Sequence, residues 1–388
     1  SILNREGSAQ AQSKGFIEDS SLDALTRAMY YNKDVRNGAS VVTDTNDAKG
    51  KRKGYGEELG LSQRFIFESG FTQGTVGFGV NAYAGGAAKL DTGAGRDDRG
   101  MFPEHEAGTS VPSDYGLANA AVKARVSNTV ITTGSQMPEL PVLAYDDGRL
   151  LPETFEGTMV TSSEIEGLEL NAGRFTAQNL MNQTGHDSAG LKSIDVMGGS
   201  YAFNDNFSAA LYFADTENTY EKKYANLNYN LPFADNQALV LDFNIYKTDL
   251  DKDFVEAATA DEDAGIDGVR ENQSNTIWSL AASYTLDAHT FTIANQRSSG
   301  DRGYDYGYGD GGSAIYLANS YLSDFNYADE TSWQASYSID FGTYGVPGLG
   351  FKTAYVTGSN IDTTNGNPNA ESAEEGREHE FYNQITYT

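Results

Sequence analysis

Two cationic side chains set two residues apart are the strongest chemical signal in this sequence. Lys123 and Arg125 lie in AAVKARVSNTV, where they alternate with Val122, Ala124 and Val126. Alternation with a period of two predicts a strand that has one apolar and one polar face. Because an arginine guanidinium can bind both oxygens of a carboxylate, the polar face of this strand is predicted to bind carboxylates.

Further cations occupy the same kind of position in other segments. The period of two places Arg27, Arg64 and Lys352 on polar faces. Arg174 is a further candidate for solute binding in the lumen, although the period of two puts it on an apolar face. Gly173 would have to shift the register, or the residue lies at a membrane rim, and these interpretations stay open. For each cation, the competing interpretation is a salt bridge to an acidic side chain on a neighbouring strand, with no role in solute binding.

A long loop, residues 135–157, follows the strand of Lys123 and is rich in Pro and Leu. Loops of this length without secondary structure usually have a function. If the polar faces line a pore, Asp146 and Asp147 are predicted to bind the cations of the pore wall and so hold the loop against it. Tyr145 and Arg149 would then lie at the narrowest point of the pore. Whether Arg149 reaches a solute or only fixes the loop stays open.

Other reactive groups are few and scattered. Asp301, in SSGD, is predicted to orient the positive end of a solute. GFGVNA (77–82) matches a dinucleotide fingerprint but has no helix after it, and DEDAGIDG (261–268) lacks the closing Glu of a calcium loop. The histidines show no metal-binding spacing, and they are His105, His186, His289 and His379. There is no cysteine, so the fold uses neither disulfides nor thiolate metal sites. Because none of these patterns is complete, we expect no catalytic residue, no metal site and no cofactor.

About 16 alternating segments position these side chains. Short connections such as YAFNDNF, LPFADNQ and YTLDAHT alternate with long ones such as 249–274 and 298–313. Short turns at one end and long loops at the other are typical of outer-membrane barrels. A closed barrel pairs its backbone groups and has no edge, whereas a soluble sandwich with such polar inner faces would lack a core. The sequence therefore predicts an all-β, transmembrane antiparallel barrel.

The composition agrees with this fold class. The chain of 388 residues has 42 glycines, 24 tyrosines and 19 phenylalanines, which suit aromatic-rich strands joined by many turns. No apolar run is long enough for a transmembrane helix. The net charge of −28 makes nucleic acid an unsuitable partner. The acidic loops are predicted either to solubilise the surface or to contact lipopolysaccharide through divalent ions.

Long stretches of the sequence resemble the OprD family of outer-membrane carboxylate channels. The stretches are ESGFTQGTVGFGVNAY (68–83), VKARVSNTV (122–130), QMPELPVLAYDDGRLLPETFEG (136–157), GLELNAGRFTAQN (167–179), AIYLANSYLSDFNY (314–327) and YGVPGLGF (344–351). The resemblance implies an 18-stranded barrel in the outer membrane of a Gram-negative cell, monomeric or loosely trimeric, with inward-folded constriction loops. It supports Arg27, Lys123 and Arg125 as members of a basic row that guides small carboxylates. Residues 1–388 are expected to form one barrel domain whose C-terminal hairpin is missing, since about two of the 18 strands are not visible.

The solute is the least determined property. The polar faces carry more neutral groups than acids, which favours cyclic or aromatic monocarboxylates over the alternative of basic amino acids and peptides. Two remoter alternatives are an outer-membrane hydrolase, for which His289 near Asp287 is the one candidate, and a surface receptor that uses the acidic loops.

Overall fold

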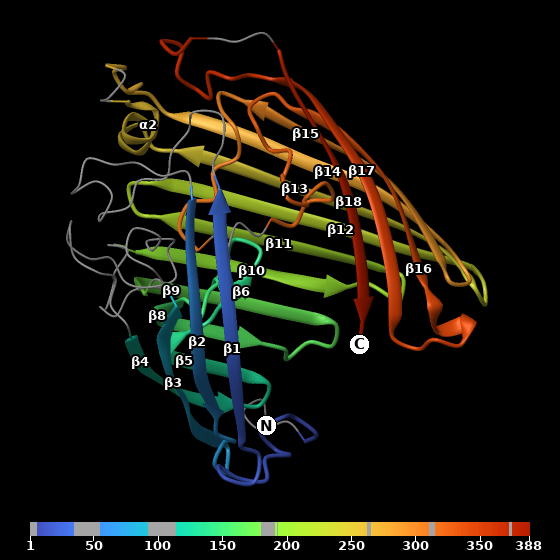
Figure 1. Cartoon of the computed structure of the whole chain (residues 1–388). Coiled ribbons are helices and arrows are strands. Elements are labelled where there is room, and N and C mark those ends of the chain that lie inside the picture. The colour runs from blue at the N-terminus through green and yellow to red at the C-terminus, as the bar shows by residue number, and fades with distance from the viewer. Residues whose placement is uncertain are drawn as a thin grey trace.

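One curved antiparallel sheet makes up most of the protein. The computed structural model describes residues 6–34, 55–91, 114–179, 191, 193–261, 265–309, 315–371 and 375–388. Within them, sixteen strands pair in chain order from β1 (Ser21–Asp34) to β18 (Gly376–Tyr387), and these two strands are the edges of the sheet. Figure 1 shows the sheet wrapped around an interior. The predicted all-β, antiparallel architecture is confirmed.

The remaining strands follow one another in the same meander. They are β2 (Tyr55–Glu68), β3 (Val76–Asp91), β4 (Asp114–Val126), β5 (Thr129–Gln136), β8 (Thr154–Ser162), β9 (Leu168–Asn179), β10 (Ile194–Ala202), β11 (Phe207–Thr216), β12 (Tyr220–Ala234), β13 (Gln237–Leu250), β14 (Gln273–Leu286), β15 (His289–Gly300), β16 (Thr331–Asp340) and β17 (Leu349–Ile361). A separate two-stranded hairpin joins β6 (Glu139–Leu140) to β7 (Leu143–Ala144).

The connections differ between the two ends of the sheet. Turns of two residues, such as 127–128 and 287–288, join strands at one end. The other end carries the long connections 251–272, which contains the helix α2 (Lys252–Thr259), and 301–330. This asymmetry is the predicted one, and in outer-membrane barrels the short turns face the periplasm. We call these ends the turn end and the loop end.

The two faces of the wall differ as the period of two predicts. Val122, Phe78 and Ile293 are 62%, 58% and 62% exposed on the outer face. On the inner face Ser279 and Gln296 are fully buried beneath inward-folded segments. An apolar outer face and a polar inner face are what a barrel in lipid requires. No helix within the described residues is both long enough and apolar enough to cross a membrane.

Aromatic rings gather at the turn end of the outer wall. The ring centre of Phe203 lies 4.8 Å from that of Tyr201 and 5.0 Å from that of Phe207. His289 and Tyr337 stack at 5.8 Å near the next turns. Such belts place amphipathic rings at the level of the lipid head groups.

The core of the molecule lies inside the curved sheet. Residues 137–153, which we call the constriction loop, bury Leu143, Leu150 and Leu151 completely. Leu143 packs with Phe175 of β9 and Tyr246 of β13, among others. Leu150 and Leu151 instead pack with Ala87 of β3 and Tyr115 of β4. The loop therefore reaches from one part of the wall to another across the interior.

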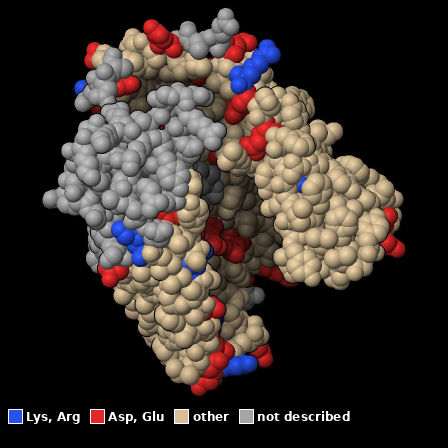
Figure 2. Space-filling model, in the orientation of Figure 1, with Lys and Arg blue, Asp and Glu red and all other residues tan. Residues whose placement is uncertain are grey.

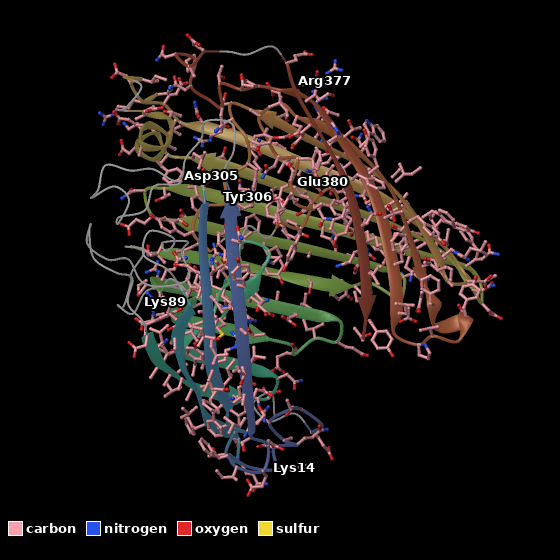
Figure 3. The ribbon with its side chains drawn as sticks, in the orientation of Figure 1. Lys14, Lys89, Asp305, Tyr306, Arg377 and Glu380 are labelled. Carbon is pink, nitrogen blue, oxygen red and sulfur yellow. The ribbon has the colours of Figure 1, made fainter. Side chains whose placement is uncertain are left out.

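A second inward segment, residues 315–330, covers the opposite part of the wall. Gln296 Nε2 donates to Asp324 O at 2.8 Å, and Gln334 Nε2 donates to Ala318 O at 2.9 Å. Glu380 of β18 accepts hydrogen bonds from the backbone N–H groups of Leu322 and Ser323. Figure 3 places Glu380, Asp305 and Tyr306 toward the middle of the molecule, with Lys14 and Arg377 at opposite ends.

A hollow remains between these segments. Figure 2 shows it as a deep opening in which acidic side chains are visible. Part of it is a cavity of about 650 Å³, bordered by Asp242, Asn244, Tyr321 and Lys352, among others. The polar inner wall thus encloses open space, as a solute path requires.

Candidate functional site

Asp147 is the point at which the constriction loop meets the cations of the wall. Arg64 Nη1 and Nη2 donate to the two carboxylate oxygens of Asp147 at 2.6 and 2.9 Å. Arg27 Nη1 donates to Asp147 Oδ1 at 3.1 Å. Two guanidinium groups thus share one carboxylate, which leaves the cluster with a net positive charge. We call Arg27 and Arg64 the mid-wall pair.

Backbone contacts strengthen the same junction. Arg27 Nη1 also donates to Asp147 O at 2.8 Å and to Arg149 O at 2.6 Å. Ser62 Oγ donates to Leu150 O at 2.7 Å. The side chain of Asp146 accepts a hydrogen bond from Gly148 N within its own turn. The loop is therefore fixed to β1 and β2 mainly through Asp147 and the residues that follow it.

The electrostatics of Asp147 follow from these partners. Burial alone would raise the pKa of its carboxyl group. The hydrogen bonds and charges of Arg64 and Arg27 outweigh burial, and the pKa is lowered below its ordinary value. The carboxylate therefore stays ionised at neutral pH, and it holds the loop as an anion.

Tyr145 and Arg149 border the same loop. Burial, followed by the charge of Glu139, raises the pKa of Tyr145 above its ordinary value, so its hydroxyl group is neutral. The guanidinium of Arg149 lies 5.4 Å from the ring centre of Tyr31 on β1. Both side chains are thus beside the mid-wall pair, at the level where the loop crosses the interior.

Lys123 and Arg125, which we call the turn-end pair, lie nearer the short turns. Gly85 of β3 pairs with Arg64 of β2 on one side and with Leu117 of β4 on the other, so Arg64 and Leu117 lie at the same height in the wall. Lys123 is six residues beyond Leu117 along β4, and is therefore closer to the turn end. The Lys123 ammonium and the Arg125 guanidinium lie 4.7 and 4.1 Å from the ring centre of Phe71. Lys123 Nζ also donates to the backbone oxygen of Ser69 at 2.7 Å. The predicted inward orientation of this pair agrees with these contacts.

Lys352 lies on a different part of the inner wall. Its ammonium is 5.1 Å from the ring centre of Tyr321, in the second inward segment. It borders the cavity of about 650 Å³ that also contains Asp242. Three asparagine side chains donate to the carboxylate of Asp242, and they are Asn226, Asn228 and Asn244. The structure therefore brings Lys352 into the hollow but not into the row formed by the other cations.

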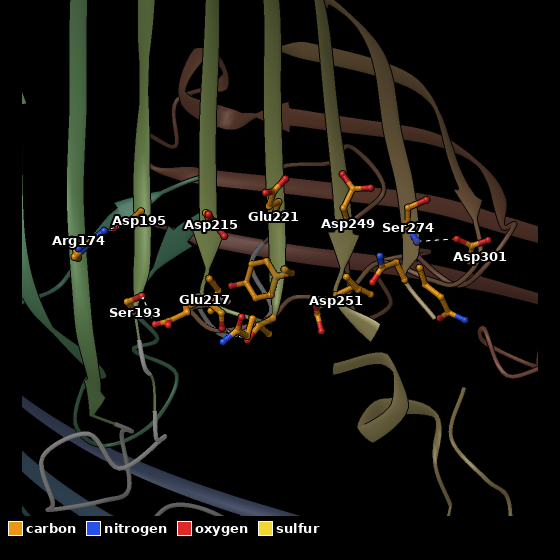
Figure 4. Close-up of a pocket in the computed structure, with 17 residues that line it drawn as sticks. Arg174, Ser193, Asp195, Asp215, Glu217, Glu221, Asp249, Asp251, Ser274 and Asp301 are labelled. Carbon is orange, nitrogen blue, oxygen red and sulfur yellow. Dashed lines mark hydrogen bonds and ion pairs between the residues drawn. The ribbon is translucent and has the colours of Figure 1, made fainter. Parts of the chain in front are cut away.

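Arg174 and Asp301 lie elsewhere. Arg174 is on the face opposite to buried Phe175, and its Nε is 2.6 Å from Asp195 Oδ1 in an exposed ion pair. Asp301 Oδ2 accepts a hydrogen bond from Ser274 N at 2.9 Å. Figure 4 shows both in one row with other acids, near the loop end. They border a pocket away from the basic row, so the lumen contact predicted for them does not fit their position.

Sequence reasoning did not identify Gln10 as a site residue. It lies in residues 1–18, a polar stretch whose sequence has no periodicity and so predicts no structure. Gln10 Oε1 accepts a hydrogen bond from Arg125 Nε at 2.9 Å, and the residue is 2% exposed. Phe71 was also not identified, although it directly follows the stretch 68–70 that precedes β3.

No group of metal-ligating side chains occurs within the described ranges. His289 contacts the hydroxyl groups of Tyr337 and Tyr344 through its two ring nitrogens, at 2.6 and 3.1 Å. These contacts place it in a turn-end aromatic cluster, remote from the constriction. His105, His186 and residues 262–264 of the acidic stretch lie outside the described residues.

Comparison with known proteins identifies the family. The profile of the OprD family of outer membrane porins matches residues 14–388. Porin D of Pseudomonas aeruginosa is 42% identical over 98% of this chain and 84% of that protein. The crystal structure of Acinetobacter baumannii OccAB1 is similar with a TM-score of 0.84 and 36% identity, over 98% of this chain and 89% of that one. The crystal structure of Pseudomonas aeruginosa OpdK with vanillate is similar with a TM-score of 0.75 and 29% identity, over 96% of this chain and 90% of that one.

These matches span nearly the whole chain, and the similar structures agree with the fold described above. They also exclude the enzyme alternative, because the matched family consists of pores. The chain belongs to the OprD family of outer membrane porins, and it is a substrate-specific channel of the outer membrane.

Proposed function

We propose that this channel takes up small carboxylate-bearing solutes by passive diffusion along its basic row. The observation that carries the proposal is the environment of Lys123 and Arg125. Within the described residues, no carboxylate oxygen lies within 4 Å of either cation. Their positive charge is therefore available to an anion in the lumen, and a channel needs such a site to bind weakly enough for release.

The mid-wall pair and the constriction loop form the narrow part of the proposed path. Arg27 guides the carboxylate at this level, while Asp146 and Asp147 shape the loop. Tyr145 and Arg149 border the opening, and their position beside the mid-wall pair supports this role. Lys352 offers a further cation on another part of the wall, in the hollow bordered by Asp242.

For the solute itself, we propose cyclic or aromatic monocarboxylates. Neutral polar groups dominate the wall around the large cavity, where Asn226, Asn244, Ser283, Thr292 and Gln334 are found. The relative OpdK was solved with vanillate, an aromatic carboxylate. The alternative of basic amino acids and peptides is favoured by one observation, the carboxylate of Asp242 in the same cavity.

The test removes the turn-end pair. Lys123→Ala with Arg125→Ala is expected to lower the anion selectivity of the channel in a planar bilayer. It is also expected to slow benzoate uptake into liposomes by at least about tenfold, since the loss of a single ionic hydrogen bond of about 1.5 kcal/mol already gives that factor. Arginine and lysine uptake, measured in parallel, distinguishes the two solute classes.

Arg174→Ala provides the matched control, because it removes one cation that lies away from the row. It should leave selectivity and uptake unchanged. Unchanged currents and uptake in the double variant would refute the basic row as the basis of function.

We also propose that residues 1–388 act as one barrel domain, monomeric or in a loose trimer. The single sheet, with no second sheet larger than the β6–β7 hairpin among the described residues, supports one domain. The apolar outer face supports contact with lipid, and the acidic row near the loop end supports contact with lipopolysaccharide.

A further inference from the structure

The N-terminal segment, residues 6–20, covers the turn end of the wall beside the turn-end pair. Gln10 N donates to Ser127 O at 3.1 Å, in the turn that follows β4. Ser13 Oγ donates to Phe71 O at 2.6 Å, in the connection before β3. A segment attached to both turns is a fixed part of the pore wall at this level.

The carboxamide of Gln10 uses both of its polar atoms. Its Nε2 donates to Thr72 O and to Gly74 O, each at 2.9 Å. Its Oε1 accepts from Arg125 Nε at 2.9 Å. Because two carbonyl oxygens require the amide nitrogen on one side, the amide oxygen must face Arg125. Gln10 therefore fixes the direction of the Arg125 side chain.

The partners of the turn-end pair that these contacts identify are neutral. They are the amide oxygen of Gln10, the backbone oxygen of Ser69 and the ring of Phe71. A ring face attracts cations through its quadrupole and carries no net charge. A carboxylate at position 10 could also contact Arg125, but it would cancel the charge that an anionic solute needs.

We propose that Gln10 is a positioning residue that sets the anion selectivity of the turn end. It holds the guanidinium of Arg125 in place with a neutral acceptor, so no carboxylate contact cancels its positive charge toward the lumen. The proposal rests on the proposed function, since the ion that benefits is the small carboxylate. It adds that selectivity depends on the charge of a residue outside the barrel strands.

Two substitutions at this position separate charge from packing. Gln10→Met and Gln10→Glu are close in size to Gln, and both lose the two donations to Thr72 O and Gly74 O. Only Gln10→Glu brings a negative charge to Arg125. Gln12→Glu is the matched control, because Gln12 lies on the same segment, is exposed, and donates to Gly7 O.

The measurement is the reversal potential in a potassium chloride gradient, together with block of the current by benzoate. Gln10→Glu is expected to lower the chloride-to-potassium permeability ratio by about fivefold, the factor for a unit charge at about 4 Å in water. Gln10→Met removes the acceptor that positions Arg125 but adds no charge, so its loss of selectivity should be smaller than that of Gln10→Glu. Gln12→Glu should stay close to the unaltered protein. Variants that insert and conduct are folded, so the comparison is made only between working channels.

Equal loss of selectivity in Gln10→Met and Gln10→Glu would overturn the proposal, since Gln10 would then act only as a staple for the segment. No shift in Gln10→Glu would overturn it as well, as would an equal shift in Gln12→Glu. If Lys123→Ala with Arg125→Ala still lowers selectivity in those cases, the proposed function stands and only the role of Gln10 falls.

Discussion

The two pairs of cations on the inner wall are held by opposite kinds of partner. Arg27 and Arg64 share the carboxylate of Asp147, which belongs to the constriction loop. Lys123 and Arg125 rest on an aromatic ring and on neutral oxygens, with no carboxylate within 4 Å among the described residues. Cations that point inward on the same kind of strand thus differ in whether a carboxylate of the protein neutralises their charge.

This difference separates formal charge from available charge. At mid-wall, much of the charge of two arginines is used to hold a loop that narrows the pore. At the turn end, the charge is held in place without being cancelled, and it can act on a passing anion. We propose that one pair shapes the pore and that the other attracts the anion, a division that substitutions can test.

The largest effect is expected from Asp147→Asn, which would make the mid-wall pair resemble the turn-end pair. Each hydrogen bond to a charged group contributes about 1.5–3 kcal/mol, so the loop should be held much less firmly. The constriction should also gain one positive charge. We expect higher anion selectivity and a noisier open-channel current in planar bilayers.

Asp146→Asn is the control for this change, because it removes an equal charge one residue away in the same loop. Its side chain accepts a hydrogen bond from Gly148 N, within its own turn. If Asp147→Asn gave a quiet current with unaltered selectivity, the mid-wall pair would not be what holds the loop.

Acid should produce a related but smaller change. The arginines lower the pKa of Asp147 below its ordinary value of 3.8, so the contact contributes stability above 3.8 and loses it as the pH falls through the lowered pKa. We expect current noise to be constant between about pH 7 and pH 5 and to rise only below the ordinary value. Asp147→Asn should lack this rise, and a rise already present near pH 6 would assign it to another group.

Arg64→Lys should have an intermediate effect on the loop and little on the charge. Lysine keeps the positive charge but lacks the planar fork that binds both oxygens of Asp147. Arg64 has a side chain only 9% exposed, so water cannot readily replace the lost hydrogen bond. We expect more current noise at an unchanged reversal potential.

Arg270→Lys is the matched control for that experiment. Arg270 pairs with Asp253 at 3.5 Å in an exposed loop, with its side chain 65% exposed, and such pairs contribute little. If Arg64→Lys did shift the reversal potential, the two-oxygen contact of the guanidinium with Asp147 would affect the ion selectivity of the channel as well as the position of the loop.

The period of two was enough to predict the faces of Arg27, Lys123, Arg125 and Lys352. Parity is a local property, since each residue along a strand points to the side opposite to its neighbour. Parity also placed Arg174 on the outer face, where the structure has it. A solute contact of Arg174 required a shift of register or a position at the rim. The pairing of β9 with β10 through Arg174 and Asp195 is unshifted, and Arg174 lies near the loop end in an exposed ion pair.

The partners of the cations could not be predicted in the same way. Asp147 is 120 residues from Arg27, and Gln10 is 115 residues from Arg125. Such contacts depend on how irregular segments fold back into the interior, and no period describes them. Asp301 shows the same limit, because a loop residue has no parity and its direction depends on the turn around it.

The smallest effect should come from Phe71→Leu, which tests the neutral support of the turn-end pair. Cation–π contacts at sites that water reaches, such as the wall of a pore, contribute about 0.5–1 kcal/mol, and Leu fills much of the same space without the ring quadrupole. We expect benzoate block to weaken by about two- to fivefold, with the current quiet, because the constriction loop is untouched. Phe78→Leu, 58% exposed on the outer face, is the matched control. If Phe71→Leu made the current noisy, the turn-end pair would also hold the pore in shape, and the division between the two pairs would fail.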